Sequence, residues 1–197
     1  ITKFPQNHHF IIKEDISNHD YIYTISDLVN LSGTRYLSKR SHVNQFKSKY
    51  GDQIEIKKID TFDNKFHLQI ENLFKEWELN KKNNLDTNNE KLALKKFLTH
   101  SHYFKTHTIG VFHKDKLIGF SIAELLENEY SIIHFEKADR NYAGIYEYIN
   151  QITAQTLSKL GYKYLNMEQD LGIEGLRNAK LSYRPSDFLK KYTISYR

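Results

Sequence analysis

Apolar residues recur at helical spacing in several stretches of the chain. The clearest stretch opens at Asp63, and its apolar side chains share one face: Phe66, Ile70, Leu73, Phe74 and Trp77. The same spacing predicts helices over residues 34–50, 90–103, 145–160 and 173–181. Ser26 is a candidate N-cap for a short helix that ends near Gly33. The polar run over residues 80–89 predicts a loop.

Short apolar runs predict strands between these helices. They cover residues 10–12, 21–23, 54–59, 108–112, 117–126, 130–135, 163–167 and 192–196. This order predicts an α/β (α+β) fold with a central mixed, largely antiparallel sheet flanked by helices. We assign residues 1–50 to N-terminal strands and a connecting basic helix, and residues 51–197 to the main domain.

The composition excludes several kinds of site. Cysteine is absent, which removes disulfides, thiolate zinc sites and a cysteine nucleophile, and fits a cytoplasmic protein. No apolar run approaches the length of a membrane span. The ten histidines include His100-x-His102, but no His-Glu-x-x-His pattern, so we expect no metal site. Because the chain begins at Ile1 rather than Met, we read it as a piece of a longer protein.

Positive charge is concentrated in two segments. Residues 34–49 hold five basic residues, including Lys39 and Arg40, and no acid. Residues 175–197 hold six basic residues and one acid. Two such segments favour an anionic ligand, and the alternative is a pair of solvated helix faces.

A first candidate site lies where the strand near residue 135 leads into the helix near residue 145. Glu136 ends the strand, Arg140 and Tyr142 lie in the polar connection, and Gly144 precedes the helix. Free backbone amides and the helix dipole at such a junction can bind a phosphate. The alternative is an ordinary helix start with an adaptable glycine.

A second candidate site follows the strand near residue 165. If this strand continues, Asn166 and Glu168 share one face, and a buried Glu168 needs a cationic partner from Arg177 or Lys180. Asp170 lies in the same segment. The functional interpretation is a general base at Glu168 beside donor-binding cations. The structural interpretation is a buried ion-pair network that holds the helix to the sheet.

A tyrosine completes this second site. Tyr183 is a candidate general acid, and the alternative is that it packs beside Pro185. We therefore take Glu168 and Tyr183 as candidate catalytic residues. The candidate donor- or phosphate-binding residues are Lys39, Arg40, Arg140, Tyr142, Gly144, Arg177 and Lys180. The candidate pocket residues are Glu136, Asn166 and Asp170.

Three separated blocks of the chain are distinctive in combination. The first is Leu31-Ser32-Gly33-x-x-Tyr36-x-x-Lys39-Arg40-x-x-Val43-Asn44-x-Phe46, and the second runs from Glu136-Lys137 through Gly144-Ile145-Tyr146. The third is Asn166-x-Glu168-x-Asp170-Leu171-Gly172-x-x-Gly175-Leu176-Arg177-x-Ala179-Lys180-x-Ser182-Tyr183-x-Pro185, followed by Lys190-Lys191-Tyr192. Together the blocks resemble the phosphatidylglycerol lysyltransferase C-terminal-domain-like family of bacterial proteins.

The resemblance implies a GNAT-like fold in a tandem architecture. Residues 51–197 would form the second GNAT unit, and residues 1–50 a remnant or linker of the pair. GNAT enzymes bind the coenzyme A pyrophosphate through a loop of the form Arg/Gln-x-x-Gly-x-Gly/Ala, which Arg140-x-x-Ala143-Gly144 matches in part. Known members of the wider group transfer an aminoacyl group from charged tRNA to a lipid. This chain departs from those membrane synthases, since its third block looks like their soluble branch.

The leading hypothesis is transfer of an acyl or aminoacyl group from an anionic donor to an amine or hydroxyl. Coenzyme A or aminoacyl-tRNA would serve as co-substrate, and no tightly bound cofactor is expected. One rival is a non-catalytic ligand-binding module on the same fold. The other is an RNA-binding protein, for which the sequence offers no recognition motif.

Overall fold

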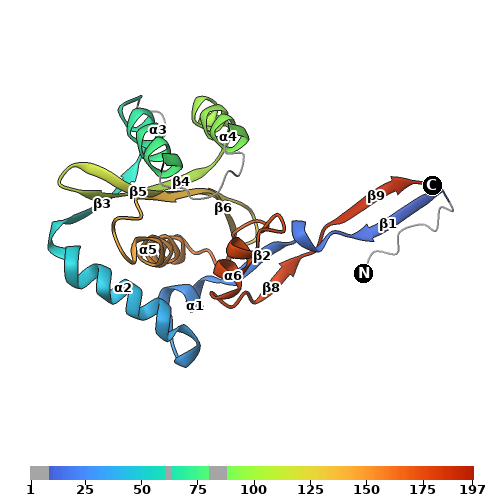
Figure 1. The fold of residues 1–197 in the computed structure, drawn as a ribbon, viewed down its shortest axis with the longest axis horizontal. Coiled ribbons are helices and arrows are strands. Elements are labelled where there is room, and N and C mark those ends of the chain that lie inside the picture. The colour runs from blue at the N-terminus through green and yellow to red at the C-terminus, as the bar shows by residue number, and fades with distance from the viewer. Residues whose placement is uncertain (1–8, 61–63, 80–87) are drawn as a thin grey trace.

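A seven-stranded mixed sheet forms the centre of the molecule (Figure 1). The computed structural model describes residues 9–60, 64–79 and 88–197. The predicted helix start at Asp63 and most of the predicted loop over residues 80–89 lie outside these ranges. The strands are β1 (Phe10–Glu14), β2 (Asp20–Thr24), β3 (Ile54–Ile59), β4 (Thr106–His113), β5 (Lys116–Leu125), β6 (Tyr130–Ala138), β7 (Tyr164–Asn166), β8 (Asp187–Leu189) and β9 (Tyr192–Tyr196). The α-helices are α1 (Ile25–Asn30), α2 (Leu37–Tyr50), α3 (Asn64–Leu79), α4 (Asn88–Thr99), α5 (Ile145–Lys159) and α6 (Glu174–Leu181).

The strand order in the central sheet is β3-β4-β5-β6-β7-β2-β8. Among the described strand pairs of this sheet, β6–β7 is parallel and the other pairs are antiparallel. This confirms the predicted mixed, largely antiparallel sheet flanked by helices. Residues 1–50 contribute β2 to the same sheet, between β7 and β8. The proposed division of the chain at residue 50 stays a prediction.

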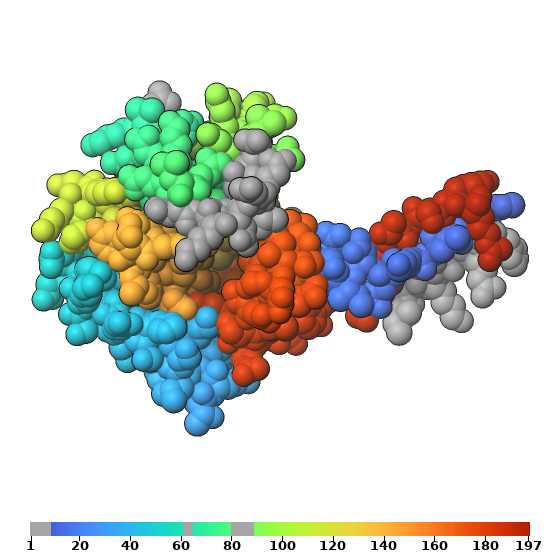
Figure 2. Space-filling model, viewed as in Figure 1, coloured from blue at the N-terminus to red at the C-terminus, as the bar shows by residue number. Residues whose placement is uncertain are grey.

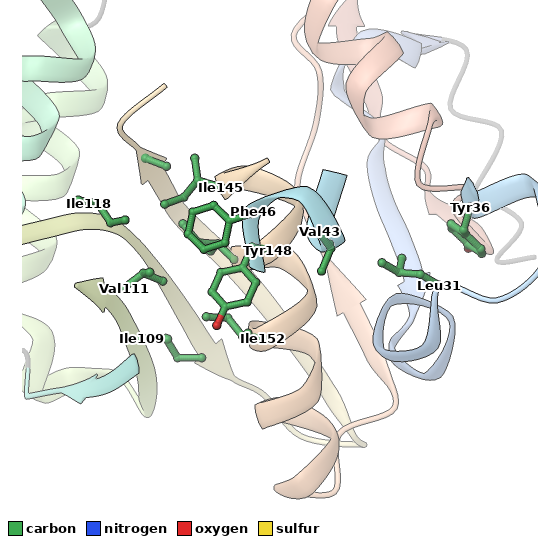
Figure 3. Close-up of a cluster of buried hydrophobic side chains, with 12 residues drawn as sticks. Leu31, Tyr36, Val43, Phe46, Ile109, Val111, Ile118, Ile145, Tyr148 and Ile152 are labelled. Carbon is green, nitrogen blue, oxygen red and sulfur yellow. The ribbon is translucent and has the colours of Figure 1, made fainter. Parts of the chain in front are cut away.

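Helices cover both faces of the sheet (Figure 1). On one face, α3 and α4 bury an apolar cluster that includes Trp77 and Phe120. On the other face, α5 lies against the sheet, with α2 packed across it. Phe46 of α2 stacks on Tyr148 of α5 with 4.6 Å between the ring centroids, and both lie near Val111 of β4 (Figure 3). Burial of large aromatic rings supplies much of the stabilisation of this layer.

The predicted elements are present with four corrections. Ser26 does not cap its helix, because α1 begins at Ile25 with Thr24 as the N-cap residue. The helix predicted over residues 34–50 begins as a 3-10 turn, Thr34–Tyr36, before α2. The helix predicted to reach residue 103 ends at Thr99, and a separate 3-10 turn, Ser101–Tyr103, follows it. The short strand β8 had not been predicted, because its three residues carry no alternating pattern of their own.

Two strands from opposite ends of the chain form a ribbon that projects from the body (Figure 1). β1 pairs antiparallel with β9, from Phe10 opposite Tyr196 to Glu14 opposite Tyr192. Every residue of both strands is exposed. Within the described ranges, no helix combines the length and the apolar character that crossing a bilayer requires.

Candidate functional site

The edge of β6 that faces β7 is open over part of its length. β6 runs from Tyr130 to Ala138, but β7 pairs with it only from Tyr130 to Ile132. β7 ends at Asn166, so residues 133–138 have no strand beside them on this edge among the described residues. Figure 2 shows this face hollowed between the segment before α5 (gold), α2 (blue) and α6 (orange). The open edge of β6 is the structural basis of the candidate site.

A β-bulge in β6 sets which side chains face this site. Ile122 of β5 pairs with Phe135 and Ala123 pairs with Ile133, so His134 is the additional residue. The bulge interrupts the alternation of side chains. Ile133 packs in the cluster beside α5, whereas His134 and Phe135 lie against Phe97 of α4. Glu136 then faces α5 again.

Glu136 is the most strongly perturbed carboxylate of the site. Asn150 of α5 donates a hydrogen bond of 3.0 Å to its Oε1. Burial raises the pKa of Glu136 to about 7, although the positive charges of Lys180 and Lys137 oppose the shift. The side chain keeps partial contact with solvent. Glu136, predicted as a pocket residue, is therefore poised to exchange a proton near neutral pH.

Lys180 of α6 lies among carboxylates. Its ammonium donates to the backbone carbonyl of Met167. Burial lowers the pKa of Lys180, although the charges of Glu168, Glu136, Asp20 and Asp170 favour the protonated form. The lysine thus brings positive charge to a site where acidic groups predominate.

Asp170 and Arg177 form a two-point ion pair at the base of α6. Arg177 Nε donates to Asp170 Oδ2 at 2.8 Å and Arg177 NH2 donates to Oδ1 at 3.0 Å. The Tyr21 hydroxyl also donates to Oδ2, at 2.5 Å. These bonds, that of Arg177 foremost, lower the pKa of Asp170 to about 2. Arg177 is thus the partner of Asp170 and not of Glu168, the partner that the sequence analysis proposed.

Glu168 does not lie on a strand face with Asn166, so this prediction was wrong. β7 ends at Asn166, and Glu168 adopts a left-handed backbone with φ of 57°. The cause is local, because the Asn166 Oδ1 accepts the Glu168 backbone N–H at 2.6 Å and turns the chain. The direct partner of the Glu168 carboxylate is His134, with 3.0 Å between Oε1 and Nδ1, rather than Arg177 or Lys180.

The start of α5 carries a carboxylate of its own. Gly144 has φ of 84°, and an added Cβ would lie 2.3 Å from the His42 carbonyl oxygen, so the glycine is required for packing against α2. Glu147 lies in the first helical turn and binds Lys39 Nζ at 3.3 Å and His42 Nδ1 at 3.2 Å. Burial alone would raise the pKa of Glu147. The bond to His42 and the charge of Lys39 lower the pKa by more than burial raises it, so the net shift is downward.

The other predicted donor-binding residues fall in separate places. Arg40 donates to the carbonyl oxygens of Leu31 and Gly33 and so closes the turn before α2. The Tyr142 hydroxyl lies 2.9 Å from His113 Nδ1 at the far end of β4. Arg140 is exposed and lies close enough to Tyr146 to lower the pKa of that hydroxyl, which burial raises overall.

Tyr183 is buried beside Lys39. Its ring is 4.2 Å from Lys39 Nζ, and its backbone carbonyl accepts the Tyr36 hydroxyl at 3.1 Å. Burial raises the pKa of Tyr183 well above its usual value, and the charges of Glu147 and Glu136 add to the shift. Its hydroxyl therefore stays protonated at physiological pH.

The structure brings together most of the second candidate site with Glu136 from the first. Lys180 lies within electrostatic range of Glu136, Glu168 and Asp170, and Tyr183 lies within that range of Glu136. Sequence analysis missed His134, Glu124 and Glu147, because none belongs to a recognisable motif. The signal for Glu147 was its position in the first turn of a helix, where a carboxylate is favoured.

The fold, with its mixed, largely antiparallel sheet flanked by helices, is GNAT-like. The chain belongs to the family described as phosphatidylglycerol lysyltransferase, C-terminal, whose model matches residues 3–195.

Several solved and curated proteins are similar to this chain. A conserved protein from Bacteroides thetaiotaomicron is 34% identical with a TM-score of 0.86, over 97% of this chain and 63% of that one. The L-PGS of Bacillus licheniformis is 16% identical with a TM-score of 0.65, over 97% of this chain and 62% of that one. An uncharacterized protein of Mycoplasmoides gallisepticum is 26% identical over 93% of this chain and 58% of its own length.

The chain therefore spans about 60% of the length of these relatives. An aminoglycoside acetyltransferase from an uncultured soil sample, solved with sisomicin, shares the fold with a TM-score of 0.51 and 16% identity. That similarity covers 70% of this chain and 91% of the acetyltransferase. The GNAT-like fold is thus shared with enzymes that act as transferases.

Proposed function

We propose that this protein transfers an acyl or aminoacyl group from an anionic donor to an amine or hydroxyl acceptor. The donor would be an acyl-coenzyme A or an aminoacyl-tRNA, used as a co-substrate rather than held as a cofactor. The observation that carries the proposal is Glu136, a partly exposed carboxylate with its pKa raised to about 7 at the open edge of β6. A group with this pKa is suited to accept a proton at neutral pH.

In the proposed reaction the acceptor attacks the donor carbonyl directly. A new C–N or C–O bond forms as the C–S or C–O bond to the donor breaks. Glu136 accepts the proton that the acceptor loses, and Tyr183 supplies a proton to the leaving thiolate or ribose oxygen. Burial keeps the Tyr183 hydroxyl protonated, so a proton is present to be donated, and its raised pKa requires the leaving atom to be the stronger base. Glu136 replaces Glu168 as the proposed base, because the Glu168 carboxylate is bound to His134.

Lys180 and Arg140 are the cations best placed for the donor. Lys180 lies beside Glu136, and Arg140 is exposed at the turn before α5, near Tyr146. Both would neutralise donor phosphates or the developing charge at the carbonyl oxygen. Lys39 is the weaker candidate, since Glu147 already neutralises it.

The test is a ligand and activity assay on three proteins. Acetyl-coenzyme A and lysyl-tRNA are each added to the wild type, to Glu136→Gln and to the matched control Glu127→Gln, an exposed turn residue. Binding is read as a rise in melting temperature. Transfer to a panel of amines is expected to fall by about 10²–10⁴-fold in E136Q and to stay unchanged in E127Q. Equal transfer by E136Q and E127Q would exclude Glu136 as the base.

A non-catalytic ligand-binding module is the second candidate. It is favoured by the side chains that already occupy the site, Glu147 at the start of α5 and Lys180 against Met167. For such a module, the same ligands raise the melting temperature of the wild type and of E136Q equally, and neither protein catalyses transfer.

A further inference from the structure

His134 lies between two carboxylates and contacts one with each ring nitrogen. Its Nε2 is 2.7 Å from Glu124 Oε2 on β5, and its Nδ1 is 3.0 Å from Glu168 Oε1 after β7. An ionised carboxylate only accepts hydrogen bonds, and a neutral imidazole has a single N–H to donate. Both contacts are therefore satisfied together when the ring carries two protons and a positive charge.

The groups that face His134 come from three elements. β5 supplies Glu124, the segment after β7 supplies Glu168, and α4 supplies the ring of Phe97 with 6.2 Å between centroids. Lys180 faces Glu168 from α6. The hydrogen bond to Glu168 is the main cause that raises the pKa of His134, burial opposes it, and the bond to Glu124 adds to it.

Glu168 occupies a strained position that needs such support. Its backbone is left-handed, as are those of Leu171 and Gly172 in the same segment, with φ of 57°, 55° and 75°. Side chains other than glycine pay a steric penalty in this region. Three bonds hold Glu168 there: its N–H donates to Asn166, its backbone carbonyl accepts the Tyr21 N–H at 3.1 Å, and its carboxylate contacts His134. The same segment presents the carbonyl of Met167 to Lys180.

We propose that His134 is a positioning residue whose imidazolium holds residues 167–172 against β5 and β6 at the open end of the sheet. The positioning of residues 167–172 by His134 does not depend on any activity. Only its consequence for catalysis rests on the proposed function. Through Met167 and Glu168 it fixes the place of Lys180 beside Glu136. When His134 loses a proton, one carboxylate loses its donor, and the Glu168 side chain is held less firmly, while the backbone bonds of Met167 and Glu168 to Tyr21 remain.

The direction of the pH dependence follows from the two carboxylates. A histidine whose folded pKa is raised contributes stability that is complete below its unfolded value, near 6.5. That contribution disappears as the pH rises through the folded value. The segment is therefore held most firmly below about pH 6.5 and is progressively released in the alkaline direction.

The first measurement is independent of any activity. Nitrogen-15 spectra of the histidine-labelled protein are recorded from pH 5 to 9, with exposed His102 as internal reference. We expect both His134 nitrogens to be protonated at pH 7 and to titrate above the ordinary histidine value near 6.5. A neutral His134 at pH 6 would overturn the proposal, because a carboxyl group would then carry the bridging proton.

The second measurement compares His134→Gln and Glu124→Gln with the control His102→Gln by amide hydrogen exchange. In H134Q, amide exchange over residues 167–172 should be roughly tenfold faster at pH 6. This is the effect expected from the loss of one hydrogen bond to a charged group. E124Q keeps the contact with Glu168 and should shift the wild-type pH profile of exchange to lower pH. If amides of residues 167–172 exchange at the same rate in H134Q and in H102Q, His134 does not position this segment.

Activity then separates this proposal from the proposed function. If transfer occurs, H134Q should lower kcat with little change in KM for the donor, and its pH profile should lose the alkaline decline. If no transfer is found in the wild type while the spectra and the exchange follow expectation, the proposed function fails and the positioning role of His134 stands.

Discussion

Arg177 binds both oxygens of Asp170, a carboxylate that is 2% exposed, while Arg177 itself remains 39% exposed. The carboxylate also receives the Tyr21 hydroxyl and the backbone N–H of Gly172. Every oxygen of this buried charge is therefore hydrogen bonded, and the ion pair links α6 to β2.

Substitution of Arg177 by Ala is expected to destabilise the fold. It leaves Asp170 buried with its charge uncompensated, so the free energy of unfolding should fall, by less than for a fully buried pair because Arg177 is partly solvated. Urea denaturation at pH 7 measures the change. The control is Arg35→Ala, whose pair with Asp27 is exposed at both ends and should cost under about 1 kcal/mol. Equal losses in both variants would mean that Asp170 finds another partner.

Substitution of Glu136 by Gln is expected to stabilise the protein in alkaline conditions. Gln keeps the acceptor for Asn150, and it removes a carboxyl whose pKa is about 7 in the folded state against an ordinary value of 4.5. Between these values the unfolded chain gives up its proton while the folded one keeps it, so wild-type stability falls as pH rises. At pH 8, E136Q should be about 2–3 kcal/mol more stable than the wild type.

The difference should vanish below about pH 4.5, where the carboxyl is protonated in both states. Thermal or urea unfolding of the two proteins from pH 4 to 9 gives the curve. A constant offset at every pH would assign the effect to packing rather than to the proton. A base that destabilises its own fold is a common compromise at active sites.

Gly144 and Gly161 form a matched pair for testing the packing of α2 on α5. Both have left-handed backbones, with φ of 84° and 91°, but Gly161 has nothing within 4 Å of an added Cβ. Gly161→Ala should cost about 1 kcal/mol from backbone conformation alone. Gly144→Ala adds a contact of 2.3 Å with the His42 carbonyl and should cost about 2 kcal/mol more. Similar melting temperatures for the two variants would show that α2 yields freely.

Local patterns predicted the elements whose residues pack in a regular way. The stripe that includes Ile145, Ile149 and Ile152 predicted α5, because these residues repeat at helical spacing and are buried. The strand β9 was predicted from its apolar run although its partner β1 lies at the other end of the chain. β8 was missed because β2, far away in the sequence, determines its strand geometry.

The sequence predicted which residues belong to the candidate site, but not which of them contact one another. Glu136, Lys180 and Asp170 were singled out, yet Glu168 was given a strand face that the Asn166 side chain abolishes. His134 bridges residues 10 and 34 positions away, and no sequence spacing encodes that geometry. Such contacts arise from the bulge and from the divergence of β6 and β7, which are tertiary features.

The β1–β9 ribbon has a consequence for how the molecule unfolds. Its strands bury no residue, so opening it exposes no additional core, and a two-stranded ribbon has little stability of its own in water. Amides of the ribbon should therefore exchange through local fraying, while β4, β5 and β6 exchange through global opening. The base of the ribbon differs from the ribbon itself, because side-chain bonds tie it to the central sheet. Lys191, just before β9, donates to Asp20 Oδ1 at 2.5 Å, and Asp20 Oδ2 accepts a hydrogen bond from the Asn166 side chain. Cooperative structure thus ends at Lys191, where the chain leaves the sheet for the ribbon.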